Sequence, residues 1–119
     1  MINSSPIARL VDIVEAVALI GSEMAAVTLD AFETDRRKRW VVARGIEIIS
    51  EASRRLPADL RARHAGSPWP KVAGIGNRLR QEYQDVVPDV LWHVVRDNLP
   101  ALDAPCREEL AVARDQTEE

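Results

Sequence analysis

The chain has 119 residues, which fits one domain that buries roughly two-thirds of its unfolded surface around a single core. Hydrophobic residues make up 46% of the chain but aromatic residues only 4%, a balance that suits packed helices better than a β-sandwich. The single cysteine, Cys106, excludes an internal disulfide and a zinc site of the Cys-pair type, so a reducing cytoplasm is the expected location.

Charge is distributed unevenly along the chain, although the net charge is only −3. Residues 36–80 hold 12 of the 16 basic residues and carry a net charge of +9, whereas the remainder carries −12. Clustered basic residues can bind phosphates locally whatever the total charge, but solvated helix faces would give the same composition. Within the apolar stretch 7–20, the charged residues Arg9, Asp12 and Glu15 exclude a membrane span and the core of a signal peptide.

The N-terminal half of the chain predicts two long helices joined by a short turn. Pro6 follows two serines suited to capping, and apolar residues then recur at helical spacing over about 6–27. Thr28 begins a short helical turn over 29–32, and a long amphipathic helix follows over about 35–56.

Prolines mark the boundaries of the elements predicted in the next part of the chain. Pro57 ends the long helix and opens a short one through His64. After the loop 66–68, a helix with Pro70 in its first turn runs to about residue 86. Its buried stripe consists of Val72, Ile75, Leu79 and Val86.

The C-terminal part predicts two further helices. Pro88 starts one of them, Leu99-Pro100 breaks it, and a last helix covers 105–114. We therefore expect an all-α chain with a single helical domain over residues 1–114 and a frayed acidic tail over 115–119.

Several short segments, in the right order and with plausible spacing, carry a resemblance to a known family. They are Arg36-Arg37, 46–52 (IEIISEA), 67–69 (SPW), 76–83 (GNRLRQEY) and 90–100 (VLWHVVRDNLP). Over about residues 7–103 the chain resembles the HepT-like branch of the HEPN superfamily. The resemblance implies an antiparallel helical bundle of HEPN type with about five to six helices, usually assembled as a homodimer.

The resemblance also implies a function. Many members of this family are toxins of toxin-antitoxin systems that cleave RNA without a metal. Their partner is a small nucleotidyltransferase antitoxin of the MntA type. We accordingly expect RNA and such an antitoxin as partners, and neither a metal nor a cofactor.

The family motif consists of an Arg, a His after four intervening residues, and a Tyr after one more. Carried over to this chain, the Arg position falls on Gly76, the His position on Gln81 and the Tyr position on Tyr83. The Asn that follows the family Arg corresponds to Asn77.

Helical spacing gives this motif a geometry. Asn77 and Gln81 project from one face, with Arg78 and Arg80 beside Gln81. These four residues and Gly76 are the candidate catalytic residues. If a two-fold axis brings the same helix of a second subunit close, the two copies would line one cleft for a single RNA strand.

The glutamine at the His position bears directly on activity. Metal-independent RNA cleavage needs a base for the ribose 2′-hydroxyl, an acid for the leaving oxygen and a cation for the developing charge, and histidine suits the first two roles. Gln81 can hydrogen-bond RNA but has no titratable proton, and loss of acid-base help costs about 10²- to 10⁴-fold in rate. Both a natural pseudo-enzyme and an introduced His-to-Gln replacement fit this residue, while Arg78 or Arg80 could supply the cation.

Two further functions compete with a weakened ribonuclease. The chain could be a non-catalytic helical adaptor that recruits the nucleotidyltransferase, or a nucleotide-binding helper for that partner. Tyr83 has two interpretations of its own: the resemblance implies that its hydroxyl is the one the antitoxin modifies with AMP from ATP, but a tyrosine at the edge of a buried stripe can also simply pack its ring.

The remaining chemistry-bearing residues favour structural roles. We expect His64 to cap the carbonyls of a helix end, and His93 to follow a helix surface. Trp69 and Trp92 are expected to anchor the core, whereas Trp40 beside the basic run 36–39 is expected to be exposed.

One pair of acidic residues has the spacing of a possible metal site or of glycosidase chemistry. Glu47 and Glu51 lie four residues apart, but Arg44, Arg54 and Arg55 are near enough to neutralise them, and no His or Asp joins them at metal-ligand spacing. We therefore expect an ion-paired helix face here.

Overall fold

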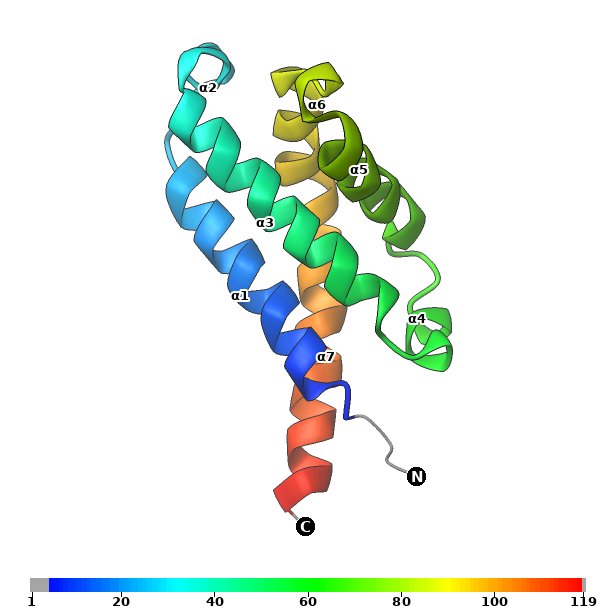
Figure 1. The fold of residues 1–119 in the computed structure, drawn as a ribbon. Helices are drawn as coiled ribbons and strands as arrows, with labels where there is room; N and C mark the ends of the chain where they lie inside the picture. The colour runs from blue at the N-terminus through cyan, green and yellow to red at the C-terminus, as the bar shows by residue number, and fades with distance from the viewer. Residues whose placement is uncertain (1–4, 119) are drawn as a thin grey trace.

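The computed structural model describes residues 5–118, and all regular structure in that range is helical, as predicted from composition and periodicity. The four long helices are α1 (Ile7–Met24), α3 (Arg36–Arg54), α5 (Trp69–Glu82) and α7 (Leu99–Glu118). Between them lie α2 (Leu29–Thr34), α4 (Ala58–Arg63), a 3-10 turn (Tyr83–Asp85), α6 (Pro88–His93) and a π-helical turn (Val94–Asn98). Figure 1 shows α1 and α3 side by side and α7 running along the length of the bundle, with the start of α1 and the end of α7 at the same end.

Capping side chains explain where the N-terminal helices begin. The Thr28 hydroxyl accepts a hydrogen bond from the Ala31 amide (3.1 Å), and the Asp35 carboxylate accepts one from the Lys38 amide (3.0 Å). The chain turns between α1 and α2 at Ala26, which has a positive φ of 63°. These boundaries lie within a few residues of those predicted.

The core lies between the four long helices and is almost wholly aliphatic. Its largest fully buried side chains are Phe32, Leu10, Ile13, Ile20, Ile46, Ile49, Leu79, Leu91, Leu99, Leu102, Val42 and Val72. The predicted stripe of α5, which continues to Val86, is buried as expected. One residue of the first predicted helix departs from expectation, because the side chain of Leu19 is 59% exposed.

The chain does not break at Leu99-Pro100, contrary to the prediction. α6 passes through the π-helical turn into α7, which begins at Leu99 and continues to Glu118, beyond the predicted end at Arg114. Proline lacks the amide hydrogen that an α-helix needs, and a wider π turn just before Pro100 is one way a helix accommodates it. Glu119, the last residue of the predicted tail, lies outside the described residues.

Pro105 lies inside α7 and leaves the carbonyl of Ala101 without its usual helical donor. The Ser67 hydroxyl donates to that carbonyl at 3.2 Å. The loop before α5 thus replaces the missing hydrogen bond, and it ties the start of α5 to α7.

Candidate nucleic-acid interface

The start of α5 is fixed by the loop that the sequence predicted. Pro68 precedes the helix, Pro70 occupies its first turn, and the indole of the buried Trp69 donates to the His64 carbonyl at 3.0 Å. Because Val72, Ile75 and Leu79 face the core, the opposite face of α5 points to solvent.

The motif residues lie on that outer face. Asn77, Arg78, Arg80 and Gln81 are all exposed, so Gln81 points away from the hydrophobic interior. Arg80 donates to the Asn77 amide oxygen at 2.5 Å. Among the described residues, Arg78 and Gln81 have no side-chain hydrogen bond or ion pair, which leaves both available to a ligand.

Gly76, to which the sequence resemblance assigns the arginine position of the motif, is buried between α5 and α3. A Cβ atom there would collide with the side chain of Ser50. The glycine therefore lets the two helices approach closely, and no side chain from position 76 can enter the outer face without moving α3 away.

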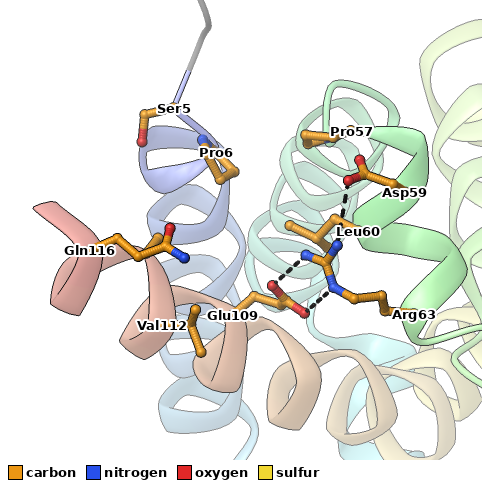
Figure 2. Close-up of a pocket in the computed structure, with 10 residues that line it drawn as sticks. Ser5, Pro6, Pro57, Asp59, Leu60, Arg63, Glu109, Val112 and Gln116 are labelled. Atoms are coloured by element: carbon orange, nitrogen blue, oxygen red, sulfur yellow. Dashed lines mark hydrogen bonds and ion pairs between the residues drawn. The ribbon is translucent and has the colours of Figure 1, made fainter.

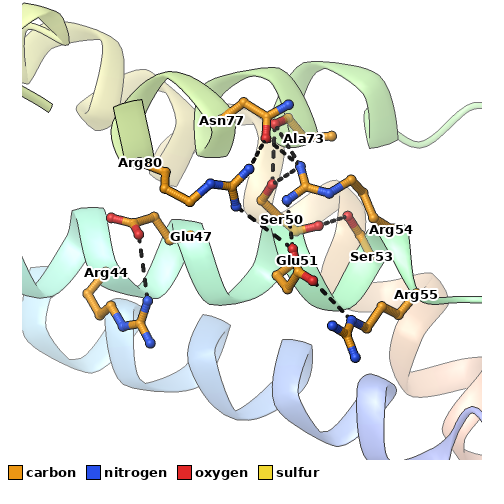
Figure 3. Close-up of polar contacts among 10 residues, drawn as sticks. All are labelled: Arg44, Glu47, Ser50, Glu51, Ser53, Arg54, Arg55, Ala73, Asn77 and Arg80. Carbon is orange, nitrogen blue, oxygen red and sulfur yellow. Dashed lines mark hydrogen bonds and ion pairs between the residues drawn. The ribbon is translucent and has the colours of Figure 1, made fainter. Parts of the chain in front are cut away.

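The structure adds a cation that the sequence did not assign to this site. Arg54 of α3 donates to the Asn77 amide oxygen at 2.9 Å and to the Ser50 hydroxyl at 3.1 Å (Figure 3). Its second terminal nitrogen lies 2.8 Å from the Glu51 carboxylate. The i, i+3 spacing indicated the contact with Glu51, but nothing in the sequence indicated that Arg54 crosses to α5.

Glu51 is the carboxylate at the centre of this network. Arg54 and Arg55 hydrogen-bond its two oxygens and hold its pKa below the ordinary value, and Arg80 lies 3.8 Å away. Glu47 pairs with Arg44 at 3.6 Å. The predicted neutralisation of both glutamates by arginines is confirmed, and the described residues include no cluster of three His, Cys, Asp or Glu suited to a metal.

Tyr83 lies just beyond α5, in the 3-10 turn, rather than within the helix. It is half-buried against the core, at the edge of the buried stripe as predicted. It also lines a surface hollow of about 330 Å³ together with Arg39, Gln84 and Pro88. A group attached to the Tyr83 side chain could occupy that hollow.

Neither histidine belongs to the motif. The His64 ring contacts the Glu109 carboxylate at 2.7 Å, so the prediction that it caps helix carbonyls was wrong. Figure 2 shows the same carboxylate bonded to Arg63, which links α4 to α7 beside a surface pocket. His93 is exposed between Asp89 and Asp97 on its own helix, as expected of a surface residue.

The tryptophans have the predicted environments. Trp69 is 6% exposed, and Trp92 packs on Phe32 with ring centroids 6.1 Å apart. Trp40 is 52% exposed and has Arg36 over its ring at 5.0 Å. The remaining nucleophile, Cys106, is buried, and burial raises the pKa of its thiol to about 12, so it is unreactive near neutral pH.

Comparisons with known proteins show the family that this chain resembles. Residues 13–109 match the family model "Ribonuclease HepT-like". The chain is 34% identical to "Probable ribonuclease HepT" of Thermococcus cleftensis, covering 78% of this chain and 84% of that protein. It is 30% identical to "Putative RNase MJ1380" of Methanocaldococcus jannaschii, covering 80% and 87% of the two chains.

A further relative is more distant but more fully covered. The chain is 26% identical to "Putative RNase TTE0752" of Caldanaerobacter subterraneus, over 87% of this chain and 93% of that protein. No solved structure matches the chain. Within residues 5–118, none of the helices has the length and apolar character needed to cross a membrane.

Proposed function

The chain belongs to the HepT-like ribonuclease family, and on that premise we propose that it is the toxin component of a toxin-antitoxin pair whose RNA cleavage is weakened or lost. In this proposal the outer face of α5 binds a single RNA strand through Asn77, Arg78 and Arg80. Gln81 contacts the RNA at the position where the family has its histidine.

The observation that supports this proposal most directly is the placement of Gln81. It is exposed on α5, one helical turn after Asn77, and an imidazole at this position would also be exposed there. An amide has no proton to exchange near neutral pH, whereas histidine can act as both base and acid. His64 and His93 contact carboxylates elsewhere and belong to other surfaces.

The test is to restore the histidine. We expect Gln81→His to raise RNA cleavage by about 10²- to 10⁴-fold in the presence of EDTA, because it returns the general acid-base group. Cleavage is measured on a 5′-labelled single-stranded RNA, and growth inhibition is measured alongside it. Gln84→His is the matched control, because it adds an imidazole at another exposed position three residues away.

Two outcomes would contradict the ribonuclease proposal. If Gln81→His is as inactive as the parent while its circular dichroism is unchanged, the non-catalytic adaptor is the better description. If Gln84→His activates cleavage equally, the position of the imidazole does not matter and the motif assignment fails.

The partner is a nucleotidyltransferase antitoxin of the MntA type, and Tyr83 is its target. The hollow beside Tyr83 could receive the attached AMP, and Arg39 in its lining could face the phosphate. The added negative charge beside the RNA-binding face would repel RNA. Incubation with the cognate antitoxin and ATP should add the mass of AMP to the parent and leave Tyr83→Phe unchanged; an adduct on both proteins would exclude this tyrosine.

The active assembly in this proposal is a homodimer. An apolar groove of about 560 Å³ between α1 and α3 supports it, because its lining includes the exposed residues Leu19 and Trp40. The groove shares Asp12, Arg44 and Ile48 with a polar furrow that reaches Glu51 and Arg80. A second copy seated there would lie next to the RNA-binding face.

A further inference from the structure

The absence of an arginine at position 76 leaves open which group supplies the cation beside the motif. A side chain at 76 is excluded by Ser50, as described above. The guanidinium of Arg54 lies next to this contact, because one of its nitrogens is 3.1 Å from the Ser50 hydroxyl and 3.5 Å from the Ala73 carbonyl. A cation from α3 thus reaches the outer face of α5, where the resemblance led us to expect an arginine from α5 itself.

Asn77 brings two cations together. Its amide oxygen accepts hydrogen bonds from both Arg54 and Arg80, so the two guanidinium groups converge on one atom (Figure 3). Two like charges held this close repel each other unless an anion lies between them. The amide nitrogen of Asn77 has no partner among the described residues, and it remains available as a further donor.

Glu51 provides the anion in the free protein. One carboxylate oxygen lies 2.8 Å from Arg54 and 3.8 Å from Arg80, and the other accepts from Arg55 at 3.0 Å. Three guanidinium groups face this single carboxylate, which leaves a local charge of +2. Carboxylate and phosphodiester oxygens bind arginine with the same fork geometry, so one can replace the other.

We propose that Arg54 and Arg80, joined on Asn77, form the phosphate subsite of the RNA-binding face, and that Glu51 occupies this subsite until an RNA phosphate displaces it. The inference rests on the proposed function and assigns two residues of α3 to it. Gln81 lies one helical turn beyond Asn77, about 6 Å further along the axis of α5, and this spacing suits a contact with the sugar or base next to the bound phosphate.

The subsite makes an unusual prediction for Glu51→Gln. Removing the internal anion should tighten the binding of a fluorescein-labelled, single-stranded 20-nucleotide RNA by about 3- to 10-fold, measured by fluorescence anisotropy. Glu47→Gln is the matched control, because it removes the same charge from the same helix one turn earlier, where the carboxylate pairs with Arg44. If the two variants bound RNA with equal affinity, the gain would come from the change in overall charge, and the proposed subsite would be wrong.

The cation is tested with Arg54→Gln. We expect about tenfold weaker RNA binding and a salt dependence whose slope falls by about 0.7, the value for one phosphate contact with a single strand. Arg55→Gln is the control, because Arg55 pairs with Glu51 but makes no hydrogen bond to Asn77 among the described residues. Arg54→Lys should retain the salt slope, which separates loss of charge from loss of packing between α3 and α5.

The outcomes keep this inference apart from the proposed function. If the parent binds RNA, Gln81→His cleaves it and Arg54→Gln has the affinity and salt slope of Arg55→Gln, the subsite is wrong and the ribonuclease proposal stands. If Gln81→His stays inactive but Arg54 and Glu51 behave as expected, the subsite stands as part of a binding protein. If the parent binds no RNA at all, both fall.

Discussion

Two clusters of arginine and glutamate join helices in this molecule, and they differ in charge balance and exposure. Between α3 and α5, the side chain of Glu51 is 46% exposed and faces three arginines. Between α4 and α7, the side chain of Glu109 is 12% exposed, pairs with Arg63 and contacts His64, while Asp59 also pairs with Arg63. The first cluster has surplus positive charge at the surface, and the second has none.

Charge balance separates a candidate binding surface from a structural contact when both contain the same residue types. Ion pairs that satisfy each other's charge hold helices together and have little left to offer a ligand. A cluster with more cations than anions, held at the surface by hydrogen bonds, attracts a further anion. Charge surplus, rather than the number of ion pairs, distinguishes the α3–α5 face.

The largest effect expected at either contact is steric and arises at Gly76. Gly76→Ala places a Cβ against Ser50, so we expect it to lower the free energy of unfolding by about 1–3 kcal/mol. Gly74→Ala, two residues earlier on α5, meets no atom within 4 Å and should instead stabilise the helix by about 0.5–1 kcal/mol. Urea denaturation of both variants measures the difference. Two variants of equal stability would show that α3 and α5 are not closely packed at this glycine.

The next effect compares the two glutamates directly. Glu109→Ala removes the acceptor of Arg63 and His64 at a mostly buried position, so we expect a loss of about 1–2 kcal/mol in unfolding free energy. Glu51→Ala acts at an exposed position, where solvent weakens the ion pairs, and should change stability much less than Glu109→Ala. Chemical denaturation at pH 7 distinguishes the two. A larger loss for Glu51→Ala would mean that the α3–α5 cluster is the structural one.

Much of the fold was predictable because it depends on local signals. The start of a helix at Thr28, the start of the next near residue 35 and the buried stripe of α5 follow from residue type and helical period, and the structure agrees with them. The predicted break at Leu99-Pro100 was wrong because a π-helical turn accommodates Pro100, and the Ser67 hydroxyl compensates for the second proline of this helix, Pro105. That compensation depends on residues far apart in the sequence.

The candidate site also has one part that the sequence predicted and one part that depends on helix packing. The exposure of Asn77, Arg80 and Gln81 follows from their spacing on one helix. The crossing of Arg54 from α3 to Asn77 depends on how closely two helices approach, and Gly76 sets that distance through its contact with Ser50. A sequence motif can indicate which face of a helix is used, but the partner from a neighbouring helix emerges only from the packing.

The smallest effect tests the structural cluster through pH. Hydrogen bonds from Arg63 and then His64 hold the pKa of Glu109 below its ordinary value of 4.5. As the pH falls, Glu109 is therefore protonated in the unfolded chain before it is protonated in the folded chain. The contribution of the ionised Glu109 to folding stability is complete above about pH 4.5 and is lost as the pH drops through the folded-state pKa. We expect Glu109→Gln to remove part of the fall in melting temperature between pH 5 and pH 3, an effect worth less than about 1 kcal/mol.

Glu51→Gln should remove less of that fall in melting temperature, because the Glu51 side chain is more exposed and solvent weakens its ion pairs. If Glu51→Gln reduced the loss of melting temperature at low pH as much as Glu109→Gln, the Glu51 carboxylate would also stabilise the fold. An RNA phosphate that displaced Glu51 would then destabilise the protein, which contradicts the proposed subsite.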